Sequence, residues 1–298
     1  MNFRFSNTVN AILISLFALF LFDIMGLIIK YLSPRYSAAE LSSYRNTIGL
    51  VPSVIALWST QSWHKAGRPI RIRQWRLGLM RGAIVSFAQL FFYLSLGLMT
   101  FASATTISYS NALFMTAFAV PILGEKVGPV RWIAVMIGFV GVVMVMGPGR
   151  DTFSISALLP VGAGALYALV GVTSRLFDDD VPTPVVNLYS AVFAAFGAYL
   201  VALAFGGFSV IHPGDLKWIV AMGTVGGCAV LCLIISYRMT EQSNIAPFTY
   251  FGIPLAFVLG WLVFDEAPWS DLFPGAILIA AGGLMIVWRE RRLKAKTA

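Results

Sequence analysis

Apolar runs of roughly 20 residues, the length that a helix needs to cross a bilayer, follow one another along the whole chain and constrain its fold most. The connections between them are short and leave no room for a separate soluble domain. We therefore expect an all-α integral membrane protein with ten transmembrane helices. The ten runs are 9–30, 38–60, 75–98, 102–123, 130–147, 155–177, 184–206, 215–238, 243–264 and 271–289.

The composition agrees with a lipid environment, because 58% of the residues are hydrophobic and only 11% are charged. The net charge of +8 does not indicate nucleic acid, since the basic residues lie in short connections where they orient helices. Cys228 and Cys232 share one apolar run and have no metal-ligand spacing. No P-loop is present. We expect no nucleic-acid partner, no metal and no cofactor.

Lysine and arginine are distributed unevenly between alternate connections. With the N-terminus inside, the inner segments hold 15 of them and the outer segments 4, while Arg45 and Arg81 lie within spans and complete the 21. Basic residues concentrate on the cytoplasmic side. We expect both termini in the cytoplasm of a bacterium, with the chain in the inner membrane. The first run is read as a retained span, because no small-residue cleavage site follows it.

The chain also aligns with itself. At an offset of 141 residues, Tyr109 meets Tyr250 and Glu125 meets Glu266; nearer the N-terminus, an offset of 145 pairs Lys30 with Arg175. We expect two five-helix repeats, residues 1–150 and 151–298. Because five is odd, the second repeat enters the membrane from the opposite side. Such inverted repeats are typical of secondary transporters, whose substrate site lies near the midplane between the halves.

Two stretches carry a resemblance to a known family: "PILGEKVGPVRWIAVMIGFVGVVMVM" and "LVFDEAPWSDLFPGAILIAAGGLMIVW". With the five-plus-five repeat, they resemble the drug/metabolite transporter superfamily, EamA-like branch. Within it the chain looks most like the YddG-type exporters of aromatic and other amino acids. The resemblance implies a central cavity lined by spans 1–4 and 6–9, alternating access and export from the cytoplasm.

Asp23 is a carboxylate in the middle of the first span. A charge at mid-helix costs about 2.5–3.5 kcal/mol, so it should face a wet cavity or a partner. Arg45 in the second span lies at a matching depth below the same membrane face. We predict that the two are neighbours, either as a structural ion pair or as the groups that contact a charged substrate. Lys30 and Glu40, near the outer surface, are expected to be solvated, and Arg81 to reach the inner interface.

Polar and aromatic residues within the spans complete the predicted substrate cavity. Ser108 and Asn111 lie on one stripe of span 4, and Gln89 and Tyr93 share a face of span 3 at i, i+4 spacing. Hydrogen bonding between helices is the alternative role for each. Pro247 and Pro254 share a face of span 9 and either serve gating or only shape packing. The remaining predicted cavity residues are Phe22, Tyr44, Tyr167 and Tyr250.

No lysine, and no arginine beyond Arg45, lies at mid-depth, which argues against phosphorylated substrates. A neutral Asp23–Arg45 pair among aromatic groups favours a zwitterion. We therefore expect export of amino acids, aromatic, hydrophobic or small, or of related metabolites. Small cationic or apolar drugs are the alternative. A membrane-embedded enzyme is less favoured, because the chain has no HExxH or GxSxG motif. The lipid bilayer and a small solute are the expected partners, and a monomer the expected state.

Overall fold

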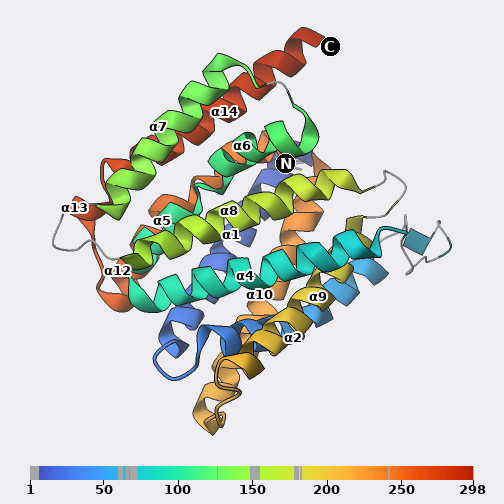
Figure 1. The fold of residues 1–298 in the computed structure, drawn as a ribbon, viewed down its shortest axis with the longest axis vertical. Helices are drawn as coiled ribbons and strands as arrows, with labels where there is room; N and C mark the ends of the chain where they lie inside the picture. The colour runs from blue at the N-terminus through green and yellow to red at the C-terminus, as the bar shows by residue number, and fades with distance from the viewer. Residues whose placement is uncertain are drawn as a thin grey trace, which may run out of the picture.

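The computed structural model describes residues 7–59, 63–64, 67, 73–125, 127–147, 155–177, 181, 183–240 and 242–297, and their regular structure is entirely helical. The helices lie as long rods beside one another (Figure 1). Large apolar side chains such as Phe17, Met136 and Leu262 are exposed along them. Such surfaces suit contact with lipid.

The first half of the chain holds six of these helices. They are α1 (Asn7–Leu32), α2 (Ala38–Trp58), α4 (Trp75–Leu98), α5 (Phe101–Ser108), α6 (Asn111–Leu123) and α7 (Pro129–Met146). In the second half two short 3₁₀ turns, Ile155–Ala157 and Ser174–Leu176, flank α8. The helices there are α8 (Leu158–Thr173), α9 (Thr183–Ala204), α10 (Pro213–Met239), α11 (Gln242–Thr249), α12 (Gly252–Phe264), α13 (Trp269–Leu272) and α14 (Gly275–Thr297).

Among the described residues, seven helical segments are long and apolar enough to cross a membrane, and they match the predicted spans 1 and 3–8. The other three predicted spans fall short for local reasons. α2 carries Arg45 and several serines, and in span 9 the apolar helix is only Gly252–Phe264, which is shorter than a full span. In α14 the described apolar stretch is Gly275–Arg289, which is also shorter than a full span.

Spans 4 and 9 are each broken near the middle. The first break lies at Tyr109 and Ser110, between α5 and α6, and the second at Tyr250 and Phe251, between α11 and α12. Pro254 explains the second break, because its ring would clash with the carbonyl of residue 250 in a continuous helix. At the first break the Ser110 N–H bonds to the Ile107 carbonyl at 3.0 Å, a tight i→i+3 turn.

α7 and α14 lie against each other at one edge of the molecule (Figure 1). Glycines bring their backbones together: a Cβ on Gly141 would lie 2.6 Å from the Gly275 carbonyl oxygen, and one on Gly282 2.6 Å from that of Ala134. Small residues allow such close approach in membrane helices. The pair is therefore a packed peripheral unit.

The remaining helices pack in pairs that join the two halves of the chain. α1 lies against α10, and α4 lies against α8. α9 packs against both α2 and α4, while α10 packs against both α1 and α2. One apolar cluster lies around α1, α4 and α10, and a second around α7, α12 and α14. Polar side chains of α1, α2, α4 and α5 are buried among these helices.

Candidate functional site

Buried polar atoms without a partner mark the candidate site. Leaving such an atom unsatisfied costs about 1–3 kcal/mol, so each one needs an explanation. A polar solute that binds among these helices would satisfy them. The side-chain atoms that have no hydrogen-bond partner within the described part of the chain include Asp23 Oδ2, Arg45 Nε, Tyr93 Oη, Thr105 Oγ1, Thr106 Oγ1, Ser110 Oγ and Tyr250 Oη.

Arg45 is held by an amide network that links α2 to α4. Its Nη1 donates to Asn46 Oδ1 at 3.0 Å, and Asn46 Nδ2 donates to Gln89 Oε1 at 2.6 Å. Gln89 Nε2 returns a bond to Asn46 Oδ1 at 3.2 Å, and Ser42 Oγ also donates to Gln89 Oε1, at 3.0 Å. These bonds orient the guanidinium from one side and leave Nε without a partner. The group is thus positioned to bind an anion.

Three other predicted site residues come together around the Arg45 guanidinium. Arg45 interacts electrostatically with Tyr93 on α4 and with Tyr167 on α8, and Gln89 reaches it through Asn46. Tyr93 is buried with its hydroxyl unpaired in the described structure. The group therefore draws on both halves of the chain.

Asp23 lies on α1 with only 5% of its surface exposed, and Tyr109 is within electrostatic range of its carboxylate. The predicted ion pair with Arg45 is not formed. The reason is the packing, because α10 contacts both α1 and α2, and Arg45 Nη2 points to the Gly226 carbonyl of α10 at 3.5 Å. The two charges therefore do not pair with each other, and each lies near tyrosines.

The two broken spans meet next to Asp23. The Tyr109 and Tyr250 ring centroids are 6.3 Å apart, and the Tyr109 hydroxyl lies against Gly252, where α12 begins. The Tyr250 hydroxyl lies against Gly283 of α14, so it points to the peripheral helix pair. Discontinuous helices at corresponding positions of the two halves are typical of transporter binding sites.

In the described part of the chain, the other predicted site residues form no hydrogen bond or ion pair with the two charged side chains; Phe22 and Tyr44 directly precede Asp23 and Arg45 in the chain. Phe22 is half-buried in the cluster around α1, and the Tyr44 ring packs on Phe208, with centroids 5.7 Å apart. Ser108 Oγ donates to the Ala104 carbonyl of its own helix at 2.9 Å. The last three, Asn111, Pro254 and Pro247, lie at the start of α6, in the first turn of α12 and within α11, and the side chain of Pro247 is outside the described residues.

Three charged residues expected to contact solvent or the interface are buried or nearly so. Glu40 closes a capping box with Ser37 at the start of α2. Arg81 donates to Ser190 Oγ at 3.2 Å and to the Val170 carbonyl at 2.7 Å. Lys30 is only 12% exposed. The expected solvation of Lys30 and Glu40 was wrong, because each finds protein partners that replace water.

A groove of about 550 Å³ lies between α4 and α8. It is lined by apolar side chains, including Phe87 and Leu166, and by none of the predicted site residues. An apolar groove open to the surface of a membrane protein suits lipid chains. It therefore has no place in the candidate site.

Sequence reasoning missed Asn46, Ser42 and the contact between Tyr109 and Gly252. Ser42 and Asn46 are four residues apart, so they share a helix face, and Asn46 directly follows Arg45. That polar face was the available signal. No sequence pattern indicated that Gly252 would meet Tyr109.

A family model described as the EamA-like transporter family matches the chain twice, at residues 9–147 and 154–288. The chain is 24% identical over 277 residues to an S-adenosylmethionine uptake transporter of Rickettsia bellii (strain RML369-C), a match that covers 92% of this chain and 91% of that one. It is 26% identical over 271 residues to a riboflavin transporter of Vibrio cholerae, covering 87% and 88%.

A third relative is the pseudopaline exporter CntI of Pseudomonas aeruginosa, 24% identical over 288 residues, which cover 93% of this chain and 94% of that protein. A solved crystal structure aligns with a TM-score of 0.65 at 22% identity and covers 96% of this chain and 99% of its own. That likeness shows a shared fold.

Proposed function

Because the chain belongs to the EamA-like transporter family, and is thus a multi-pass membrane transporter rather than an enzyme, we propose that it transports small zwitterionic metabolites across the membrane. During transport the substrate binds between Asp23 and Arg45. Amino acids with an aromatic, hydrophobic or small side chain are the first candidates, exported from the cytoplasm. The observation that carries the proposal is a pair of opposite charges that do not pair with each other: Asp23 is buried, Arg45 is partly buried, and each has a buried side-chain atom without a partner in the described structure.

Two opposite charges that do not pair with each other support a zwitterion as the substrate. The ammonium of an amino acid suits the Asp23 carboxylate, and its carboxylate suits Arg45, whose guanidinium the Asn46–Gln89 network already orients. Tyr93, Tyr109 and Tyr167 supply aromatic surface for the body of the solute. Orienting partners that are in place before binding reduce the entropy that the substrate must lose.

The relatives' names broaden the substrate class and leave the direction of transport open. S-adenosylmethionine joins an amino-acid head group to a cationic sulfonium, which is compatible with one anionic and one cationic protein group. The relatives include both uptake transporters and an exporter. Amino-acid-related metabolites therefore belong in the first screen.

A second candidate is the transport of small cations. It is favoured by one observation: Arg45 does not neutralise Asp23, whose Oδ2 has no partner among the described residues. A compound with a single positive charge and an apolar body would satisfy that carboxylate. In this case Arg45 would have only a structural role.

We infer an inverted repeat of residues 1–150 and 151–298 that works by alternating access. Three observations support it. The family model matches once in each half, and the breaks at Tyr109 and Tyr250 are 141 residues apart. In addition, a helix contact between the halves has a counterpart when each helix is replaced by its equivalent in the other half. Thus α1 against α10 corresponds to α8 against α4. Ten spans would put both termini on the same side, and the excess of lysine and arginine in the inner connections supports the cytoplasm for them and the bacterial inner membrane as the location.

The test is counterflow in proteoliposomes loaded with radiolabelled phenylalanine, S-adenosylmethionine or riboflavin, with and without a pH gradient. We expect saturable transport of phenylalanine, with a rate that falls at least tenfold in folded Asp23→Asn. The control variant is Asp215→Asn, which should transport as wild type. Asp215 lies at the start of α10, where its carboxylate pairs with Arg35. Dependence on the gradient would indicate proton coupling. Movement of cations only would favour the second candidate, and no amino-acid movement would refute the first.

A further inference from the structure

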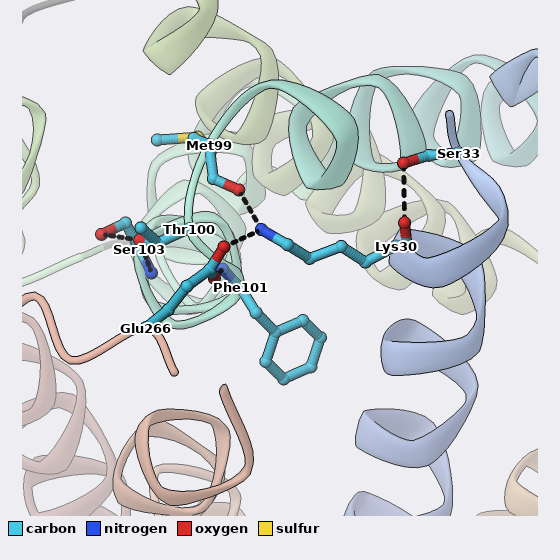
Figure 2. A network of polar contacts seen from close by, with 7 residues as sticks. All are labelled: Lys30, Ser33, Met99, Thr100, Phe101, Ser103 and Glu266. Atoms are coloured by element: carbon cyan, nitrogen blue, oxygen red, sulfur yellow. Dashed lines mark hydrogen bonds and ion pairs between the residues drawn. The ribbon is translucent and has the colours of Figure 1, made fainter. Parts of the chain in front are cut away.

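Lys30 joins three segments of the chain (Figure 2). Its Nζ lies 2.8 Å from Glu266 Oε1, just beyond α12, and donates to the Met99 carbonyl between α4 and α5 at 2.7 Å. Glu266 Oε2 accepts the N–H of Phe101, the first residue of α5, at 2.9 Å. The ion pair therefore ties the end of α1 to the ends of both broken spans.

A second ion pair has the repeat-related residues. Arg175, after α8, pairs with Glu125, after α6. Lys30 and Arg175 are 145 residues apart, and Glu125 and Glu266 are 141 apart, the two offsets at which the halves align. Each pair joins one half to the other. When the halves are exchanged, the Lys30–Glu266 pair becomes the Arg175–Glu125 pair.

The two ion pairs lie at opposite ends of the bundle. Lys30 bonds to Met99, directly after the last residue of α4, whereas Gln74, directly before α4 begins, bonds to Leu176 beside Arg175 at 3.2 Å. α4 has 24 residues, so the pairs are separated by roughly 36 Å, at 1.5 Å per residue. That distance exceeds the hydrocarbon thickness of a bilayer.

We propose that the Lys30–Glu266 and Arg175–Glu125 ion pairs are the two latches of the transport cycle, one for each side of the membrane. This role rests on the proposed alternating-access function. Opening one end separates only the pair at that end, while the other pair keeps the opposite end closed. Both pairs are formed here, so the structure corresponds to a state closed at both ends.

The latches differ in exposure, and this difference sets their relative strength. The side chains of Lys30 and Glu266 are 12% and 25% exposed, whereas Arg175 is 61% exposed. Solvent and salt screen exposed ion pairs more strongly. The Arg175 latch should therefore separate more readily, and high salt should favour opening at that end.

The experiment measures from which side a central cysteine can be reached. Ser110, buried at the first break, is replaced by Cys in a Cys228→Ala/Cys232→Ala background, and a membrane-impermeant maleimide is added to right-side-out or inverted vesicles. The latch variants are Lys30→Met, Glu266→Gln, Glu125→Gln and Arg175→Met. Lys217→Met, an exposed lysine at the start of α10, is the matched control.

We expect Lys30→Met and Glu266→Gln to raise the labelling rate at least threefold from one side, and Glu125→Gln and Arg175→Met to do so from the other. The charge exchange Lys30→Glu/Glu266→Lys should recover part of the wild-type closure, because it re-forms the ion pair but not the bonds to the Met99 carbonyl and the Phe101 N–H. Equal changes from both sides, or no change in the folded isosteric Glu→Gln variants, would overturn the proposal. Labelling needs no substrate, so a failure to transport amino acids does not affect this result.

Discussion

Tyr109 at the break of span 4 touches Gly252 at the break of span 9: a Cβ on residue 252 would lie 1.7 Å from the Tyr109 hydroxyl oxygen. This contact joins the two halves next to the buried Asp23. The arrangement of the candidate site therefore depends on residue 252 having no side chain.

Gly252→Ala should lower the free energy of unfolding by about 1–3 kcal/mol, because the added methyl group overpacks the contact with Tyr109. Thermal unfolding in detergent measures the effect. Gly214→Ala is the control, since a Cβ there meets nothing within 4 Å. Adding Tyr109→Leu should recover part of the loss. Equal melting temperatures for the two single variants would contradict the close contact.

Asn46→Ala should weaken both stability and substrate affinity. It removes the acceptor of Arg45 Nη1 and of Gln89 Nε2, and unsatisfied buried groups cost about 1–3 kcal/mol each. Melting curves and the KM for transport are the readouts. Ser53→Ala on the same helix removes only a bond to the Gly49 carbonyl, so it should leave KM unchanged. An unchanged KM in Asn46→Ala would show that the amide network around Arg45 does not contribute to substrate binding.

Pro254→Ala should slow transport while leaving substrate affinity within about twofold. Without the proline ring, a continuous helix through Tyr250 is no longer sterically excluded. The helices α11 and α12 could then join, and the break would be lost. Single-turnover and steady-state transport rates measure the change. Pro121→Ala, inside α6 and away from a break, is the matched control. A wild-type rate in Pro254→Ala would show that the break has no part in gating.

Gly141→Ala should destabilise the protein without changing its order of preference among substrates. The new Cβ would lie 2.6 Å from the Gly275 carbonyl and separate α7 from α14, at the periphery of the bundle. Gly128→Ala, where a Cβ meets nothing within 4 Å, should be neutral. Melting temperature and competition profiles test both statements. An altered profile would place the α7–α14 pair in the site.

Much of the fold could be predicted from the sequence, because apolar runs long enough to span a bilayer determine where helices form. The all-helical architecture is confirmed, and the seven long apolar segments match predicted spans. The break at Pro254 follows from proline chemistry. The break at Tyr109 does not, because no proline interrupts span 4 there.

The site was predicted less well, since depth along a helix says nothing of its rotation or its neighbours. Asp23 and Arg45 have matching depths, yet α10 packs against both of their helices and the two residues form no ion pair. In contrast, Gln89 and Tyr93 were correctly placed on one face, because i, i+4 spacing fixes relative rotation within a single helix.

The most direct test of the central claim is competition for transport among three compounds of similar shape: phenylalanine, phenethylamine and 3-phenylpropionate. The second lacks the carboxylate and the third lacks the ammonium. If Asp23 and Arg45 bind opposite ends of a zwitterion, wild-type protein should prefer phenylalanine at least tenfold over both. Asp23→Asn should remove the preference over 3-phenylpropionate, and Arg45→Gln the preference over phenethylamine. A uniform loss for all three compounds in folded Asp23→Asn would contradict the account.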